Sequence, residues 1–209
     1  MKFQEELENR LLGSKFRLLN DKLYKKKKVN ENEMKEYYKY YEYQIRKWPS
    51  NPLDTIIKKI DELNKEAVIA DLGCGSGKIS QTFKNVHSFD AFPSDKNIIK
   101  SDISSVPLED KQCDVVVCCL SLMMDYISKV VLEVSRILKI DGIWYLAEVK
   151  SRISSVNFLC KQLETFGFTV VNCDTSNSHF VLIELKKDKD FDKKKIPKII
   201  LKPCSYKKR

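Results

Sequence analysis

The chain has 209 residues, of which 43% are hydrophobic and 32% charged, and its formal net charge at pH 7 is +9. This length suits one domain with a full core, and no apolar run is long enough for a membrane-spanning helix. The seven cysteines and two histidines do not fall at metal-ligand spacing, which predicts reduced thiols in an intracellular protein without a structural metal. The N-terminus lacks the apolar core of a signal peptide.

The positive charge is confined to the two ends of the chain. Residues 1–50 carry 13 Lys and Arg against 8 Asp and Glu, a balance of +5, and residues 186–209 carry 11 against 3, a balance of +8. Residues 51–185 carry 14 against 18, a balance of −4. Basic ends on a mildly acidic middle favour contact with a polyanion, most simply nucleic acid, although lysine-rich ends can also serve solubility alone.

The predicted elements begin with a helical, basic segment over residues 1–52. Apolar residues at helical spacing predict a helix over 1–24, and a lysine run over 25–28 interrupts that pattern. The tyrosines over 37–43 have two interpretations: surfaces on which nucleic-acid bases stack, or, at helical spacing, core residues and a lid over a cofactor. An amphipathic helix is predicted over 53–63.

From residue 67 onward strand and helix patterns alternate, which is typical of a parallel sheet covered on both faces. A link too short for a crossover helix separates the runs over 168–174 and 178–186, which predicts an antiparallel hairpin at the sheet edge. The α/β domain therefore spans 53–187, and a basic tail over 188–209 contains a short strand or docking segment at 199–201. The other predicted strands cover 67–72, 86–91, 98–102, 113–119 and 142–149, and the helices cover 77–84, 125–138 and 153–166.

The stretch VIADLGCGSGKIS, residues 68–80, places a glycine-rich loop directly after an apolar strand that ends in an acid. Glycines allow a sharp turn there and admit a ligand close to the backbone. A dinucleotide fingerprint would place its third glycine at position 78, which is Lys78, whereas the glycines are Gly73, Gly75 and Gly77. This spacing is the form shown by S-adenosylmethionine-dependent methyltransferases of the Rossmann-like class.

Acids also end the next two predicted strands. Asp90 follows the second strand, where a carboxylate can accept hydrogen bonds from both ribose hydroxyls of a bound nucleoside. Asp102 follows the third strand and can accept from an adenine amino group, with Ile103 packing on the ring. Helix or turn capping is the alternative for each acid. With Asp71 at the first strand, three acids favour a cationic sulfonium cofactor over the anionic NAD.

Several further motifs carry a resemblance to a known family. They are, in order, LLGSKFRLLNDKLY, RKWPSNPLD, ADLGCGSG, SSVPLEDKQCDVVVCCLSLM, AEVKSR, NSHF and LKPCSYKKR. From about residue 10 to its end, the sequence resembles the ribosomal RNA-processing protein 8 family, known in animals as nucleomethylin. Its members are nucleolar enzymes that resemble base methyltransferases acting on N1 of an adenine in large-subunit ribosomal RNA. In animals the family is also linked to a silencing complex on ribosomal gene chromatin.

The resemblance implies a fold, a cofactor, partners and a location. The fold is α/β, a Rossmann-like class I methyltransferase with a seven-stranded, mostly parallel sheet and an antiparallel edge hairpin. The cofactor is S-adenosylmethionine, leaving S-adenosylhomocysteine as product, and the partner is ribosomal RNA in the nucleus and nucleolus. Tyr38 stands where the family has a cofactor-binding histidine, so that contact is a tyrosine here. The implied cofactor contacts are Tyr38, Gly73, Gly75, Asp90, Asp102, Ile103 and Cys119.

The acceptor side of the site is less specified. Adenine N1 carries a lone pair at neutral pH, so no general base is expected, and no residue is assigned as a catalyst. Ser121 and Met123 are candidates to shape the acceptor pocket, with apolar packing as the alternative for Met123. Glu148 and Arg152 have two interpretations. In one, Glu148 binds an acceptor amine and Arg152 binds a phosphate; in the other, the two side chains pair with each other. The segment 177–180 either lines the RNA side or forms a hairpin turn.

The basic ends of the chain favour an RNA substrate over a small-molecule substrate. Lysines over 25–28 and the basic residues over 207–209 would supply salt-sensitive RNA affinity, and such runs also act as nuclear import signals. A chromatin- or histone-associated module that binds the cofactor as a sensor is the second hypothesis. A small-molecule methyltransferase is the third, and it explains the charged ends poorly.

Overall fold

The computed structural model contains two compact units among its described residues. One is helical and comprises the chain up to Asn51 together with Pro203 and Cys204. The other runs from Pro52 to Lys202 and contains the sheet, so residues 188–192 and 196–202, predicted as part of a tail, belong to the same unit as the sheet. The described residues are 2–25, 28–192 and 196–204, with side chains from residue 11 onward.

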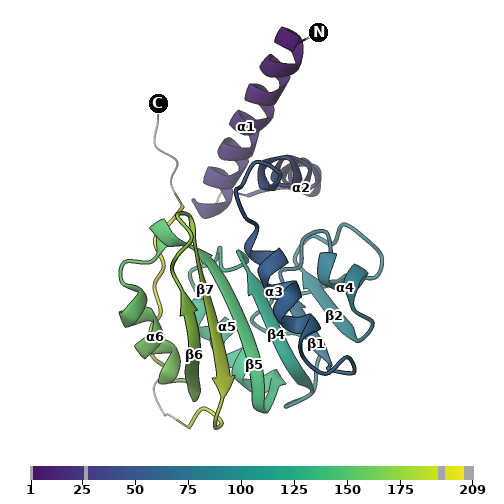
Figure 1. The fold of residues 1–209 in the computed structure, drawn as a ribbon. Coiled ribbons are helices and arrows are strands. Elements are labelled where there is room, and N and C mark those ends of the chain that lie inside the picture. Colours follow the sequence, from purple (N-terminus) through teal and green to yellow (C-terminus); the bar gives the residue numbers. More distant parts are fainter. Residues whose placement is uncertain (1, 26–27, 193–195, 205–209) are drawn as a thin grey trace. The chain divides into compact units, whose positions relative to one another are not determined.

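Helices and strands follow the predicted order (Figure 1). The tyrosine-rich α2 lies within the segment over 1–52 that was predicted as helical, although no bounds were predicted for it. The helices are α1 (Lys2–Tyr24), α2 (Glu31–Ile45), α3 (Pro52–Asp61), α4 (Lys78–Thr82), α5 (Ile127–Ile137) and α6 (Val156–Glu164), with a 3₁₀ turn η1 (Lys150–Arg152). The strands are β1 (Ile69–Leu72), β2 (Val86–Asp90), β3 (Ile99–Lys100), β4 (Cys113–Cys119), β5 (Leu138–Val149), β6 (Phe168–Asp174) and β7 (Phe180–Lys187).

In the helical unit, α1 and α2 pack on each other through aromatic side chains. The start of α2 is fixed by a capping box, because the Asn30 side chain accepts from the Glu33 N–H at 2.9 Å and the Glu33 carboxylate accepts from the Asn30 N–H at 3.1 Å. Tyr37 and Tyr40 are each only 5% exposed, and the ring of Tyr37 stacks on Phe16 with centroids 5.6 Å apart. These two tyrosines are therefore core residues of this unit.

The sheet has the strand order β3-β2-β1-β4-β5-β7-β6. Strands β1 to β5 pair in parallel, and β7 is antiparallel to both β5 and β6, which confirms the seven-stranded, mostly parallel sheet with an antiparallel hairpin at its edge. Asp71 is in register with Ser88 on one side and Val117 on the other, so the carboxyl ends of β1, β2 and β4 reach the same edge of the sheet. The residues that follow these strands are thereby brought together.

Side chains of β4 alternate between two cores, as a strand buried on both faces requires. Val116 and Cys118 face the larger core under α5 and α6, whereas Val115 and Val117 face the smaller core under α3 and α4. Figure 1 shows α3 on one face of the sheet and α5 on the other. This two-sided burial explains why the strand reads CDVVVCC, apolar at almost every position.

Residues 196–202 form a docked segment without a strand. Ile199 is 1% exposed and belongs to the larger core, its N–H donates to the Ser128 hydroxyl at 2.8 Å, and that hydroxyl donates to the Pro197 carbonyl at 2.7 Å. Of the two alternatives for residues 199–201, the structure contains the docking segment.

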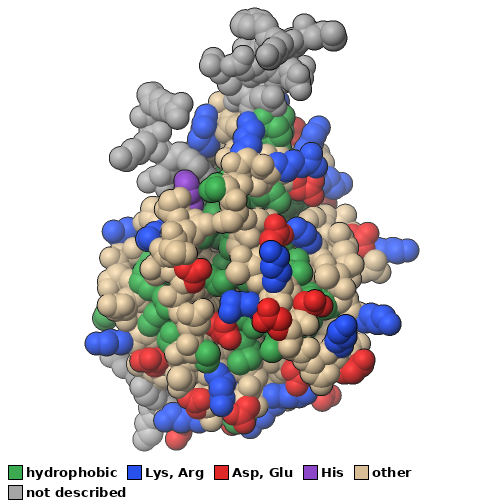
Figure 2. Space-filling view, in the orientation of Figure 1, with side chains coloured by type: hydrophobic (Ala, Val, Ile, Leu, Met, Phe, Trp, Pro, Cys, Tyr) green, Lys and Arg blue, Asp and Glu red, His purple; other side chains and the backbone are tan. Residues whose placement is uncertain are grey.

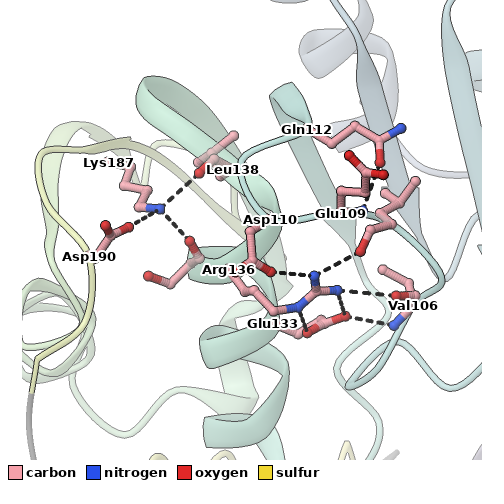
Figure 3. Close-up of polar contacts among 11 residues, drawn as sticks. Val106, Glu109, Asp110, Gln112, Glu133, Arg136, Leu138, Lys187 and Asp190 are labelled. Carbon is pink, nitrogen blue, oxygen red and sulfur yellow. Dashed lines mark hydrogen bonds and ion pairs between the residues drawn. The ribbon is translucent and has the colours of Figure 1, made fainter.

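A polar cluster lies at the amino ends of the parallel strands, opposite the carboxyl ends where the glycine loop follows β1 (Figure 3). The fully buried Lys187 ammonium donates to the carbonyls of Ser135 at 2.5 Å and Leu138 at 2.9 Å, and it pairs with Asp190 at 2.8 Å. Arg136 binds Glu133 and several atoms of the 106–110 loop in the same view. The buried Lys187 cation is tolerated here because each of its three N–H groups has an acceptor.

The surface of the sheet unit carries both signs of charge. Figure 2 shows basic and acidic side chains interspersed over the face that carries α3, and ion pairs on this unit include Lys59 with Glu184 at 2.8 Å and Lys78 with Asp54 at 2.5 Å. Within the described ranges, no helix is both long and apolar enough to cross a bilayer. Nor do the described residues gather three or more metal-ligating side chains at one place.

Candidate functional site

The loop between β1 and α4 has a conformation that needs its glycines. Gly73, Gly75 and Gly77 have φ angles of +78°, +58° and +71°, a left-handed region that side chains with a Cβ rarely adopt. A Cβ added at Gly73 would lie 2.4 Å from the Cβ of Ser121, so the loop also approaches the end of β4 very closely. The glycine spacing therefore serves both the turn and the close packing.

Two buried acids lie beneath this loop. Asp90 is 6% exposed, and its carboxylate accepts from the Gly75 N–H and the Phe92 N–H, each at 2.9 Å. Each carboxylate oxygen has two acceptor positions, so Asp90 can hold the loop and also accept from a diol. Asp71 is 3% exposed; burial, and then the charge of Asp90, raise its pKa from 3.8 to about 7. We call Asp71, Asp90 and the loop 73–77 the acidic cradle.

Asp102 lies exposed just after β3, with its carboxylate oriented by two donors. The Ser104 N–H donates to one oxygen at 2.9 Å and the Tyr126 hydroxyl to the other at 2.7 Å. Partial burial opposes ionisation, but these hydrogen bonds outweigh it and hold the pKa of Asp102 below its usual value. Ile103 next to it is 5% exposed and packs in the larger core.

The end of β4 borders the cradle. Cys119 is half-buried, and burial followed by the charge of Asp71 raises the pKa of its thiol well above the usual value, so this thiol stays protonated. Leu120 has a φ of +57° without being a glycine, and the Ser121 hydroxyl is buried beside the Cys118 thiol. Met123 is partly exposed. We call residues 120–123 the β4 loop.

Glu148 and Arg152 pair with each other, which decides between their two interpretations. Their side chains are 2% exposed each, and the guanidinium Nη1 donates to the Glu148 carboxylate. Burial, opposed by the Arg152 charge, raises the pKa of Glu148. Buried in this way, the guanidinium is not available at the surface for a phosphate.

Three other predicted features have separate outcomes. The Asn177 side chain accepts from the N–H groups of His179 at 2.7 Å and Phe180 at 3.1 Å, which is the geometry of a turn. Tyr38 belongs to the helical unit, where its ring centroid lies 5.8 Å from that of Tyr37, and its contact with a cofactor stays a prediction. Lysines 26 and 27 of the first basic run, and all of the basic run over 207–209, lie outside the described residues.

Two residues that the structure brings to this edge were not predicted from the sequence as site residues. Asp71 was noted as the acid that ends a strand, but its raised pKa depends on burial and on Asp90, which the motif alone does not show. Tyr126 reaches Asp102 from the start of α5, and no sequence spacing links the two. The structure gathers Gly73, Gly75, Asp90, Asp102, Ile103 and Cys119 along one sheet edge.

The cradle suits a cationic ligand that carries a nucleoside. Burial and the Asp90 charge are the two influences that raise the pKa of Asp71, and neither comes from a cation, so a positive ligand group would relieve an existing repulsion. The same charges disfavour a diphosphate at this loop. An oriented carboxylate at Asp102 offers an acceptor to an exocyclic amine.

The strand order and the glycine-loop site define a Rossmann-like methyltransferase fold. A methyltransferase from Aquifex aeolicus described as SAM-dependent superposes with a TM-score of 0.59 at 14% identity, over 77% of this chain and all of that one. The chain belongs to the methyltransferase family whose model, described as hypothetical methyltransferase, matches residues 2–209.

Curated relatives align along almost the whole chain. Ribosomal RNA-processing protein 8 of Drosophila melanogaster is 36% identical over 98% of this chain and 60% of that protein. The 25S rRNA (adenine(645)-N(1))-methyltransferase of Schizosaccharomyces pombe is 34% identical over 99% of this chain and 72% of that protein. The chain thus spans about 60% of the length of the Drosophila relative, and also of the Dictyostelium discoideum relative.

Proposed function

We propose that this chain is an S-adenosylmethionine-dependent RNA methyltransferase that acts on N1 of an adenine in large-subunit ribosomal RNA. The acidic cradle is the observation that carries the proposal, because two buried acids against a glycine loop suit a sulfonium cofactor. The substrate is proposed from the names of the relatives, which specify ribosomal RNA processing and, in fission yeast, adenine N1.

The acidic cradle and the neighbouring ends of β3 and β4 each have a proposed role toward the cofactor. Asp90 accepts the ribose hydroxyls, while its bond to the Gly75 N–H keeps the loop in place. Asp102 accepts from the adenine amino group, and Ile103 contributes to the apolar side of that position. Asp71 attracts the positive charge of the methionine portion. Cys119 borders the cofactor at the end of β4.

Methyl transfer to adenine N1 depends on positioning the two reactants and needs no general acid or base. When bound, S-adenosylmethionine supplies a methyl group activated by its sulfonium. Adenine N1 attacks through its own lone pair, so the chain must place this atom about 3 Å from the methyl carbon and in line with the sulfur. Burial raises the pKa of Cys118 to about 12 and that of Cys119 well above its usual value, so neither thiol serves as a thiolate nucleophile.

The target adenine must present its Watson–Crick edge, which is occupied by base pairing in a double helix. Because N1 lies on the Watson–Crick edge, the target adenine has to be unpaired or extruded from its helix before it can enter the site. The net positive charge of the chain favours binding of such an RNA through its phosphates, with an affinity that falls as salt rises. On this proposal the protein acts in the nucleus, in the nucleolus, where ribosomal RNA is processed.

The test is methyl transfer to defined RNA. The protein is incubated with methyl-labelled S-adenosylmethionine and unmodified large-subunit ribosomal RNA, and the product is mapped by reverse-transcription arrest and nucleoside mass spectrometry. We expect label in N1-methyladenine at one position. Asp90→Asn should lose the transfer. Asp114→Asn is the matched control, because Asp114 also accepts a backbone N–H, from Val68 at 2.9 Å, but at the opposite end of β4.

Two outcomes would reject the proposal. Absence of label in RNA from a protein that binds the cofactor would exclude the RNA substrate. If such a protein instead co-purified with histone tails, a nucleolar chromatin-associated module would be the better account. Equal transfer by wild type and Asp90→Asn would reject the role given to the cradle.

A further inference from the structure

The β4 loop has a backbone that needs external support. Leu120 is held in the left-handed region at φ +57°, a conformation that costs a leucine about 1 kcal/mol or more, and its N–H donates to the Ala147 carbonyl at 2.9 Å. Next to it, Ser121 lies so close to Gly73 that no Cβ would fit on the glycine. A small shift of this loop therefore changes the wall of the cradle on the side where β4 ends.

Arg152 supports the loop from inside the protein. Its guanidinium Nη2 donates to the Leu122 carbonyl at 2.7 Å, Nη1 donates to the Glu148 carboxylate, and Nε donates to the Lys202 carbonyl at 2.8 Å. The side chain is 2% exposed, and the carboxylate of Glu148 balances its charge. Because all three nitrogens of the planar guanidinium donate hydrogen bonds, its position and orientation are fixed. It therefore holds the Leu122 carbonyl in a defined place.

The third of these acceptors belongs to the docked segment 196–202. That segment is fastened separately to two helices, through the Ser128 hydroxyl on α5 and through Gln162 on α6, whose side chain donates to the Lys198 carbonyl at 2.8 Å. The Lys202 N–H also donates to the Arg152 carbonyl at 2.8 Å. Arg152 is thus the link between the docked segment and the β4 loop.

We propose that Arg152 is a positioning residue for methyl transfer, which transmits the docking of segment 196–202 to the β4 loop and so fixes Ser121 against Gly73. Its effect on catalysis rests on the proposed function, whereas its effect on the loop does not. A guanidinium that only stabilised the fold would alter the melting temperature and leave the loop and the turnover unchanged. The two roles therefore differ in what they predict.

The first variant is Arg152→Lys, which keeps the charge beside Glu148 but carries all its donors on one nitrogen, whereas Arg152 meets its three acceptors with three separate nitrogens. We expect kcat for methyl transfer to ribosomal RNA to fall at least about tenfold, because misplacement of reacting groups by about 1 Å can cost 10²-fold. The KM for S-adenosylmethionine should change less than kcat, since the hydrogen bonds that orient Asp90 and Asp102 are untouched. Amide hydrogen exchange over residues 120–124 should become faster.

Arg136→Lys is the matched control. Arg136 also donates in several directions, to Glu133, Asp110 and the Leu108 carbonyl, but it does so at the opposite edge of the sheet (Figure 3). This variant should lower the melting temperature without changing kcat or the exchange of residues 120–124. Ser128→Ala is the second test variant, because it loosens the docked segment without touching Arg152.

Ser128→Ala should change kcat and loop exchange in the same direction as Arg152→Lys, and the double variant should lose less than the product of the two effects, because both act through one link. Unchanged kcat and loop exchange in a folded Arg152→Lys protein would overturn the inference. If Arg152→Lys did not fold, Ser128→Ala would decide alone by the same two readouts. If the wild type methylated no RNA, the proposed function would fail, and loop exchange would still decide the role of Arg152.

Discussion

Asp71 gives the most quantitative prediction, which concerns the pH dependence of cofactor binding. Its pKa of about 7 means that half of the apo protein carries a neutral carboxyl at pH 7, whereas a cationic cofactor favours the ionised form. If only the ionised form binds, the apparent association constant is proportional to the fraction of Asp71 that is ionised. That fraction is about 9% at pH 6 and about 91% at pH 8. Affinity should therefore rise about tenfold, or about 1.4 kcal/mol, across this interval.

The assay is isothermal titration with S-adenosylmethionine at pH 6, 7 and 8, in two buffers of different ionisation enthalpy. Near pH 7 the wild type should release about half a proton on binding, because the cofactor displaces the proton of Asp71. Asp71→Asn should bind more weakly at pH 8 and lose this part of the pH dependence. The cofactor's own amino group titrates in both proteins, so the difference between them isolates Asp71. Identical pH profiles for the two proteins would refute the reasoning.

The same carboxyl makes the stability of the apo protein depend on pH. The folded apo protein is favoured by low pH, whereas cofactor binding is favoured by high pH. Its pKa is raised on folding, from 3.8 to about 7, so the stabilisation is complete below about pH 4 and is lost as pH rises to about 7. At ~1.4 kcal/mol per pKa unit the loss amounts to about 4 kcal/mol at most. Asp71→Asn should therefore be more stable than wild type at pH 8 in urea unfolding, and a less stable variant would contradict the assigned burial.

Three further substitutions test the rest of the cradle and the neighbouring Asp102. Asp90→Asn should weaken S-adenosylhomocysteine binding about 10- to 100-fold in calorimetry, because charged hydrogen bonds are worth about 1.5–3 kcal/mol; an unchanged Kd would exclude Asp90 as a ligand. Tyr126→Phe should weaken the same binding about 2- to 10-fold by releasing Asp102, with no effect expected if the adenine lies elsewhere. Gly73→Ala should abolish binding, since its Cβ would meet Ser121 at 2.4 Å, whereas Gly13→Ala, with open space around it, should leave binding unchanged.

Strand positions could be predicted from the sequence because burial on two faces leaves a clear pattern. The predicted and observed bounds of β4 agree, from residue 113 to 119, and the short link before β7 correctly predicted an antiparallel hairpin. The start of β5 at Leu138 was not predicted, since a left-handed Asp141 and a break in register after Cys113 interrupt its pattern. Local conformations of this kind are set by pairing with a neighbour and leave no periodic signal.

The site was predictable where one short segment supplies the geometry and not where several segments meet. The glycine loop is a contiguous motif, so its conformation follows from its spacing. By contrast, Glu148 and Arg152 had two interpretations, and the choice depends on acceptors from Leu122 and Lys202, far away in the sequence. For residues 199–201 the apolar run left a strand and a docking segment as alternatives, and the choice depends on Ser128 in α5, far away in the sequence.

A crystal structure of the chain with bound S-adenosylhomocysteine tests the central claim most directly. The account predicts the ribose hydroxyls on the Asp90 carboxylate, the adenine amino group on Asp102, and the amino-acid portion beside Asp71 and the glycine loop. A ligand located away from the carboxyl edge of the sheet, or a cradle closed by its own side chains at saturating ligand, would contradict it.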